Sequence, residues 1–351
     1  MLKEINFILN NELVKIKDID PNITVLNYLR ELKNLRGTKE GCASGDCGAC
    51  TAVIAELVNN KLKYKSINTC IMFIYNLHGK QLITVEDLKD NQKLHPVQKS
   101  MIEYGGSQCG FCTPGFIMSM YAMHKNKINP TNSNINRYLS GNLCRCTGYR
   151  PIKDALKNLK KYKSLNSDSS LILKKLKRIK LNDVVLTNNK SKFFIHKNLE
   201  TFKKDFIKSN NPSLLVGGTD LSLEITKKRK NLEEIFYLGQ NIDLNFVRVK
   251  QDNLHIGAAT PINDILESLK KYYPEFYEMF ERYGSEQIRN VASLGGNIGS
   301  ASPIGDSLPV LISLDTKLVL DGNKSRKIPM SDYFVGYRQT KLRKKEFIKE
   351  I

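Results

Sequence analysis

Eight cysteines in two groups of four are the residues of this 351-residue chain best suited to chemistry. The first group has the spacing C-x4-C-x2-C-x19-C and the second C-x2-C-x31-C-x1-C. The first contains Cys42, Cys47, Cys50 and Cys70, and the second contains Cys109, Cys112, Cys144 and Cys146. Cysteines grouped in this way in an intracellular chain indicate metal binding rather than a disulfide scaffold.

The first group has the spacing of a plant-type [2Fe–2S] centre. Thiolates must wrap a compact, net-negative cluster, so the loop has to curl tightly and direct backbone N–H groups at sulfur. Gly41, Gly45 and Gly48 permit this curl through positive φ and close approach. Cys70 would complete the site from a separate segment. A zinc ribbon is the alternative, although zinc sites favour two C-x2–4-C knuckles.

The second group ends in an unusual pair, Cys144 and Cys146, separated by one residue. Two irons bridged by sulfide accept such a pair more readily than one tetrahedral zinc, but spacing alone leaves zinc open. Thr113 and Pro114 predict an N-cap and the first residue of a helix. The preceding cysteines of this group would therefore lie where helix N–H groups favour an anionic cluster.

Residues 1–82 predict a small α+β unit of the β-grasp ferredoxin type. Alternating apolar residues and paired asparagines indicate hairpins. The expected order is strands over residues 5–9 and 13–16, a helix over 23–35, and a second hairpin with strands over 51–57 and 61–67.

Residues 83–164 predict a unit of four short helices that carries the second cysteine group. Helices are expected to open near Pro96, at Thr113, near Asn136 and at Pro151. Methionines 118, 120 and 123 are expected in the core rather than as ligands.

Residues 165–190 read as a polar, basic linker, for which docking onto an acidic partner is an alternative to a solvated connector. Residues 191–351 predict a mixed α/β domain with two glycine-rich loops, Leu214–Leu221 and 291–303. Both loops can present N–H groups to a pyrophosphate. Neither matches G-x-G-x-x-G, so a Rossmann site is not predicted.

The bulk composition favours a globular chain outside the membrane. The formal net charge is +20, with 55 basic and 35 acidic residues, spread along the sequence. No helix-turn-helix, zinc-finger or RNA-binding motif accompanies the charge, so no nucleic-acid partner is predicted. No stretch approaches about 18 uncharged apolar residues, and the N-terminus lacks a signal-peptide pattern. A cytoplasmic protein without a membrane segment is expected.

Three cysteine-bearing motifs closely resemble the molybdenum hydroxylase family. They are the segments 37–51, 108–115 and 141–151, and the likeness continues through both glycine loops. Within the family the resemblance is to the small subunit of bacterial xanthine dehydrogenases. It implies an α+β multidomain fold: a β-grasp [2Fe–2S] domain, a four-helix [2Fe–2S] domain and a vanillyl-alcohol-oxidase-type (PCMH) FAD-binding domain.

The resemblance implies that this chain transfers electrons rather than oxidising substrate. Purine oxidation would occur at a molybdopterin centre on a large partner subunit in a hetero-oligomer. Electrons would pass to the helical-domain cluster, then to the β-grasp cluster, then to FAD and finally to NAD. Gln108 matches a glutamine that lies against the molybdopterin, and no residue here matches a catalytic acid or base. The family's C-terminal flavin-associated domain, with a lysine that contacts FAD, has no counterpart before Ile351.

FAD contacts are implied at positions that match the family's flavin motifs. The first loop supplies Leu214, Leu215, Val216, Gly217, Gly218, Thr219, Asp220 and Leu221. The remaining positions are Tyr283, Ser293, Asn297, Asp306 and Ile348. For Tyr283, ordinary core packing is the alternative.

Two other functions fit parts of the same pattern. One is a non-enzymatic two-cluster redox module with an incomplete flavin site. The other is the same subunit role in a carbon monoxide, aldehyde or nicotinate-type enzyme. Fusion of clusters and flavin on one chain favours xanthine dehydrogenase.

Overall fold

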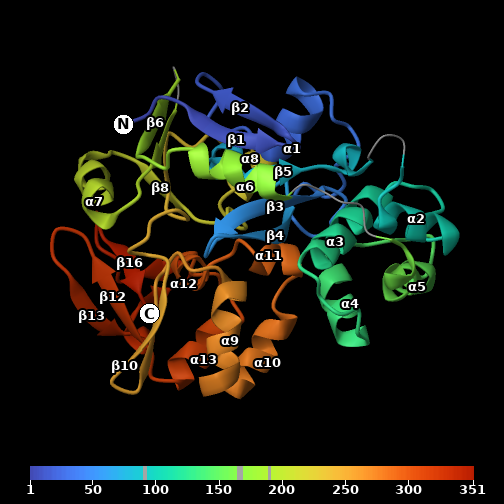
Figure 1. Cartoon of the computed structure of the whole chain (residues 1–351). Helices are drawn as coiled ribbons and strands as arrows, with labels where there is room; N and C mark the ends of the chain where they lie inside the picture. The colour runs from blue at the N-terminus through green and yellow to red at the C-terminus, as the bar shows by residue number, and fades with distance from the viewer. Residues whose placement is uncertain (90–92, 164–168, 189–190) are drawn as a thin grey trace.

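A five-stranded mixed sheet forms the N-terminal part of the computed structural model, which describes residues 1–89, 93–163, 169–188 and 191–351 (Figure 1). Its strand order is β2-β1-β5-β3-β4, with β1 parallel to β5 and the other neighbours antiparallel. Its strands are β1 (Ile5–Leu9), β2 (Glu12–Ile16), β3 (Thr51–Val58), β4 (Lys61–Asn68) and β5 (Gln81–Ile83). Asn10, Asn59 and Asn60 have positive φ at the two hairpin turns, as paired asparagines predict.

The helix expected over residues 23–35 is much shorter, and that prediction was wrong in its length. Helix α1 spans Val25–Asn27 and continues as a π-helical turn, η1 (Tyr28–Leu32). Leu32 is 53% exposed, so the leucine repeat does not follow one buried face. After this turn the chain is not helical, and Arg30 Nη1 donates to the carbonyl oxygen of Thr38 at 2.9 Å.

Four helices pack around one apolar core to the side of this sheet (Figure 1). They are α2 (Pro96–Glu103), α3 (Thr113–Lys125), α4 (Asn132–Leu139) and α5 (Arg150–Lys157), with the 3₁₀ turns η3 (Val85–Leu88) and η4 (Leu159–Lys161). The 3₁₀ turn η2 (Ile74–Leu77) packs in the core of the N-terminal sheet. The three core methionines are confirmed as buried. Two boundaries differ from expectation: the N-cap of α3 is Cys112 rather than Thr113, and α4 begins at Asn132, where the Thr131 hydroxyl caps it.

Part of the expected linker is folded. Helix α6 spans Ser169–Arg178, and strand β6 spans Val184–Thr187. Ile172 and Leu176 lie one turn apart on α6 and pack against Ile8 of the N-terminal sheet. The basic residues of this segment occupy the rest of the helix, which explains why its composition reads as a connector.

A second sheet, with order β6-β7-β9-β8, shares a hydrophobic core with the N-terminal sheet. Phe193 and Tyr75 illustrate the contact, with ring centroids 4.7 Å apart. This layer contains β7 (Lys192–Ile195), α7 (Leu199–Lys208), β8 (Pro212–Leu215), α8 (Leu223–Thr226) and β9 (Glu234–Tyr237).

The C-terminal part lies below both sheets in Figure 1 and has its own core. Its helices are α9 (Ile262–Tyr272), α10 (Pro274–Arg282), α11 (Glu286–Arg289), α12 (Leu294–Gly299), α13 (Ser307–Ser313) and the 3₁₀ turn η5 (Met330–Asp332). Its strands are β10 (Val247–Lys250), β11 (Asn253–Ile256), β12 (Lys317–Asp321), β13 (Arg326–Pro329), β14 (Phe334–Gly336), β15 (Gln339–Thr340) and β16 (Phe347–Glu350). Among the described residues, no helix has the length and apolar character needed to cross a bilayer.

Candidate functional site

The first cysteine group lies in a curled loop whose backbone points at sulfur. The Sγ of Cys42 accepts N–H bonds from Ser44 at 3.4 Å, Asp46 at 3.3 Å and Cys47 at 3.3 Å. In return, the Cys42 N–H donates to the Cys47 Sγ at 3.3 Å. Such a cradle stabilises negative charge on sulfur, as an anionic cluster requires.

Cys50 and Cys70 come from separate segments and place their sulfur atoms 3.3 Å apart in the interior. Contact with Cys70 lowers the pKa of the Cys50 thiol, and the same contact raises the pKa of Cys70. Burial acts to raise the pKa of Cys42, but the N–H donors outweigh it and lower that pKa to about 6. The first group therefore contains Cys42, whose thiol loses its proton readily, and the pair Cys50 and Cys70. The two thiols of that pair cannot both be ionised unless a cation binds them.

The second group forms two similar cross-segment pairs. Cys112 is in contact with Cys144, and Cys109 with Cys146. Burial acts to raise the pKa of Cys144, but hydrogen bonds from Thr147 and neighbouring N–H groups lower it to about 7. Burial, followed by contact with Cys144, raises the pKa of Cys112 to about 12. Cys109 and Cys146 are exposed at the surface.

Paired sulfurs fit a [2Fe–2S] cluster, in which each iron takes two protein ligands. No three histidine, cysteine or carboxylate side chains in the described part of the chain are gathered closely enough for a single metal ion. The charge on two thiolates in contact would be neutralised by iron. Both cysteine groups therefore have the donor chemistry that the cluster needs.

The two cysteine loops touch each other directly. The Leu143 N–H, one residue before Cys144, donates to the Cys47 carbonyl oxygen at 2.9 Å. A Cβ atom on Gly48 would lie 2.0 Å from the Gly141 carbonyl oxygen. A Cβ on Gly115 would lie 2.3 Å from the Gly48 carbonyl oxygen. Glycine is needed here so that the two loops can approach this closely.

The two glycine-rich loops of residues 191–351 also meet, and they meet beside the first cysteine group. A Cβ on Gly217 would lie 2.2 Å from the Val291 carbonyl oxygen, so the loops touch backbone to backbone. Ser222 Oγ donates to the carbonyl oxygen of Ile71 at 2.6 Å. Ile71 follows Cys70, so the first loop lies against a cysteine-bearing segment.

Several of the other predicted flavin contacts gather around Tyr283. Asn297 Nδ2 donates to the Tyr283 hydroxyl at 3.0 Å. Burial, followed by the negative charges of Asp306 and Asp220, raises the pKa of Tyr283. Ser293 Oγ accepts the Gly296 N–H at 3.1 Å and so caps α12, while Ile348 packs in the same core as that helix. An aromatic ring, amide and hydroxyl groups and two glycine loops in close contact are groups that fit a flavin dinucleotide.

Comparison with known proteins agrees with this geometry. Residues 84–157 match the family described as "[2Fe-2S] binding domain", and residues 189–351 match "FAD binding domain in molybdopterin dehydrogenase". The chain is 32% identical to a xanthine dehydrogenase of Emericella nidulans over 96% of its own length. This chain belongs to the molybdenum hydroxylase family. Its α+β fold class and its iron–sulfur and FAD cofactors are thereby confirmed.

Other relatives are similar to this chain at a comparable sequence identity. Xanthine dehydrogenase/oxidase of Mus musculus is 32% identical over 99% of this chain, and xanthine dehydrogenase 1 of Arabidopsis thaliana is 32% identical over 93%. The chain spans only 29% to 30% of these relatives' own lengths. Quinoline 2-oxidoreductase from Pseudomonas putida 86 is similar at 29% identity, covering 50% of this chain and 96% of that one, but its TM-score of 0.38 adds nothing to the assignment.

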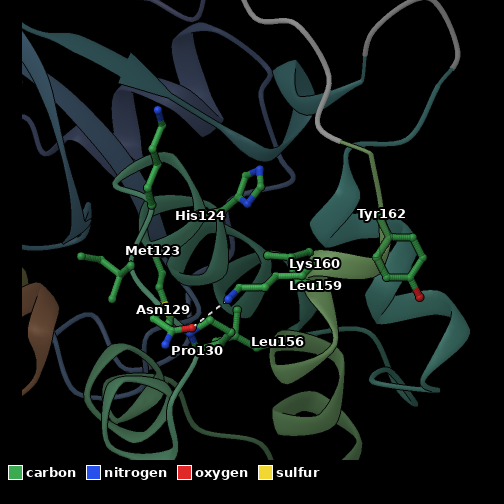
Figure 2. Close-up of a pocket in the computed structure, with 10 residues that line it drawn as sticks. Met123, His124, Asn129, Pro130, Leu156, Leu159, Lys160 and Tyr162 are labelled. Carbon is green, nitrogen blue, oxygen red and sulfur yellow. Dashed lines mark hydrogen bonds between the residues drawn. The ribbon is translucent and has the colours of Figure 1, made fainter.

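A pocket of about 290 Å³ lies apart from the redox residues of this molybdenum hydroxylase chain. Figure 2 shows its apolar wall, which includes Met123 and Leu156, and its polar rim, where Lys160 Nζ donates to Asn129 Oδ1 at 3.0 Å. It lies by the C-terminal end of α3, whereas Cys112 caps the N-terminal end. No cysteine and no predicted flavin contact lines it, so it is not part of the candidate site.

Sequence reasoning missed the residues that join the three parts. Lys227 Nζ donates to the Cys42 carbonyl oxygen at 2.5 Å, and Ile288 packs beside Cys50 and Cys70. Helix α11, drawn in orange, lies between strand β4 and helices α3 and α4 (Figure 1). Gln108 is exposed beside Cys109, where a partner can reach it.

Proposed function

We propose that this chain is the electron-transfer and flavin part of a xanthine dehydrogenase. Electrons pass from a molybdopterin centre on a partner subunit to the Cys109, Cys112, Cys144 and Cys146 group, then to the Cys42, Cys47, Cys50 and Cys70 group, then to FAD and NAD. One observation carries the proposal. The second cysteine loop, the first cysteine loop and the paired glycine loops form an unbroken series of direct contacts.

The proposed domains follow this series. Residues 1–82 form the ferredoxin domain, 83–164 the helical cluster domain, 165–190 the connection and 191–351 the FAD domain. Iron–sulfur clusters exchange single electrons and flavin exchanges one or two, so their combination can deliver a hydride. The protein's own contribution is to ligate the clusters, to direct N–H groups at their sulfurs and to fix the distances between centres.

The surface around the second cysteine group supports docking of a large subunit. Phe111 is 50% exposed, Leu143 45% and Tyr149 38%, next to the exposed Cys109 and Cys146. Apolar side chains gathered at an exposed redox site are typical of a protein interface. Gln108, in the same loop, is proposed to face the molybdopterin.

The purified complex tests this function. The chain is co-expressed with its molybdopterin-binding partner, and iron, FAD and molybdenum are quantified before xanthine and NAD are added. The proposal predicts two clusters and one FAD per chain, and flavin that is reduced by NADH and by xanthine. Clusters with no FAD would indicate a redox module instead, while activity restricted to aldehyde, carbon monoxide or nicotinate would change the substrate.

A further inference from the structure

Gln287 is a fully buried side chain of the flavin part that reaches both cysteine-bearing parts. Its Nε2 lies 3.0 Å from Asn142 Oδ1, 3.2 Å from Ser119 Oγ and 3.3 Å from Thr51 Oγ1. Thr51 follows Cys50, Asn142 lies two residues before Cys144, and Ser119 lies on α3. One amide therefore contacts the helical part and the N-terminal sheet at the place where the two cysteine loops meet.

The partners of Gln287 are themselves bonded to the junction of the loops. Asn142 Nδ2 donates to the Gly48 carbonyl oxygen at 3.0 Å, and the Thr51 hydroxyl donates to the same oxygen at 2.7 Å. Ser119 Oγ donates to Asn142 Oδ1 at 2.6 Å. Gly48 follows Cys47, whose carbonyl oxygen accepts the Leu143 N–H. The network thus holds the residues on either side of the hydrogen bond between the Leu143 N–H and the Cys47 carbonyl oxygen.

The hydrogen-bond pattern determines which way the Gln287 amide faces. Asn142 must direct Nδ2 at a backbone oxygen, so its Oδ1 is an acceptor. Gln287 must therefore present its NH₂ group. Its Oε1 is left buried against Gly141, and no donor among the described residues reaches it. An unsatisfied buried oxygen is costly, so a role in folding alone does not account well for this side chain.

The neighbours of Gln287 on α11 keep it in place. Glu286 Oε2 accepts from Arg137 Nε of α4 at 2.9 Å. Ile288 reaches within 3.3 Å of the position that a Cβ on Gly45 would take, in the first cysteine loop. Because both flanking residues are anchored to different parts, Gln287 has little freedom to shift.

We propose that Gln287 is a positioning residue that sets electron exchange between the two clusters. It orients Asn142 and Thr51, these fix Gly48, and Gly48 fixes the hydrogen bond between the Cys47 carbonyl and the Leu143 N–H. The inference rests on the proposed function, because it requires that both cysteine groups hold clusters. It adds that a residue of the flavin domain, which is a ligand of neither cluster, controls electron exchange between the two clusters.

The test uses the full complex with Gln287→Met, which keeps the length of the side chain and removes its donor. Electron paramagnetic resonance of the reduced protein reports each cluster and the magnetic interaction between them, and rapid mixing reports flavin reduction through the clusters. Gln287→Met is expected to keep both cluster signals and the iron content, to alter the interaction between the clusters, and to slow internal transfer by about tenfold or more. Thr51→Val should shift both readouts in the same direction by less.

Two further variants serve as controls. Gln240→Met removes another glutamine of the flavin part, whose Nε2 donates to the carbonyl oxygen of His78 in the N-terminal part at 2.5 Å, and should leave both readouts at the wild-type level. Gln287→Glu, protonated because it is buried, can donate to Asn142 Oδ1 and should restore most of the interaction.

Three results would overturn the inference. If Gln287→Met left the magnetic interaction and the internal transfer rate unchanged, the side chain would have no effect on electron exchange between the clusters. Loss of a cluster signal in both Gln287→Met and Gln287→Glu would assign the residue to folding. An equal change in Gln240→Met would assign the effect to domain contact in general. Wild-type protein with two interacting clusters but no xanthine activity would refute the proposed function and leave this inference standing.

Discussion

Three glycines set how close the two cysteine loops come at the scale of single residues. The carbonyl oxygen of Gly141 lies 2.0 Å from the place a Cβ on Gly48 would take, and the carbonyl oxygen of Gly48 lies 2.3 Å from the place a Cβ on Gly115 would take. Gly48 also has a φ of +70°, which side-chain-bearing residues avoid. The cysteines could be predicted from their spacing alone. The glycines at the contact between the loops could not, because Gly48 and Gly141 are 93 residues apart in sequence and no local pattern encodes their contact.

Gly48→Ala should destabilise the protein by about 2–4 kcal/mol, because the added Cβ combines an unfavourable φ with a backbone clash. Gly105→Ala is a matched control: its φ is +62° and nothing lies within 4 Å of its added Cβ. The control should lose only about 1 kcal/mol. Urea unfolding of both variants measures this, and equal losses would show that the close approach is not required.

Lys65 is a buried cation between a carboxylate of strand β3 and a carboxylate of helix α9. Its Nζ lies 2.5 Å from Glu56 Oε1 and 3.3 Å from Asp264 Oδ2. Lys65→Met leaves buried Glu56 without its ion-pair partner and leaves Asp264 with Lys63 alone, and it should cost about 3–5 kcal/mol. Lys63→Met, which removes a 45% exposed partner of Asp264, should cost about 0–1 kcal/mol in the same unfolding experiment. A similar loss in both variants would contradict the role of burial.

The same group predicts how stability depends on pH. Burial acts to raise the pKa values of Glu56 and Asp264, but the charge and hydrogen bonds of Lys65, together with the charge of Lys80 at Glu56 and of Lys63 at Asp264, outweigh burial and lower both pKa values. A lowered pKa in the folded state stabilises above the unfolded values, near 4, and that stability disappears as pH falls through the folded values. Lys65→Met should raise these pKa values and move acid unfolding to higher pH, which circular dichroism across a pH series would record.

At the scale of elements, hairpins were predictable and short connecting helices were not. The asparagine turns encode β1–β2 and β3–β4 locally, so their prediction from the sequence was confirmed. Helix α11 has only four residues and no periodic pattern, and its position depends on partners such as Arg137, which lies 149 residues before Glu286 in sequence. The predicted flavin residues around Tyr283 do come together, but the resemblance indicated them, not their local pattern.

Helix α11 should lose its anchor when Glu286 loses its charge. Glu286 Oε2 accepts from Arg137 Nε at 2.9 Å and from Arg289 Nη2 at 3.2 Å, and Arg289 is 1% exposed. Glu286→Gln leaves a buried guanidinium without its counter-ion and should cost about 3 kcal/mol. Glu278→Gln, at an exposed position of α10, should stay within about 0.5 kcal/mol. Thermal unfolding with no difference between them would refute the anchor.

At the scale of the whole molecule, the three parts are joined far more tightly than a chain of separate domains with a linker. One core runs through the N-terminal sheet and the β6–β9 layer, and α6 covers the N-terminal sheet from within the expected linker. Composition could not reveal this, because a helix with one narrow apolar stripe reads as basic and polar. The packing of the parts against one another therefore fixes the distances between the redox groups.

The central claim is that each cysteine group holds its own [2Fe–2S] cluster. Iron analysis with electron paramagnetic resonance of the reduced protein tests it on the wild type, Cys47→Ala and Cys146→Ala. The wild type should contain four irons and two distinct signals. Each variant should lose one signal and half of the iron, and the two variants should lose different signals. Zinc in the wild type, or a single signal abolished by both variants, would contradict the account.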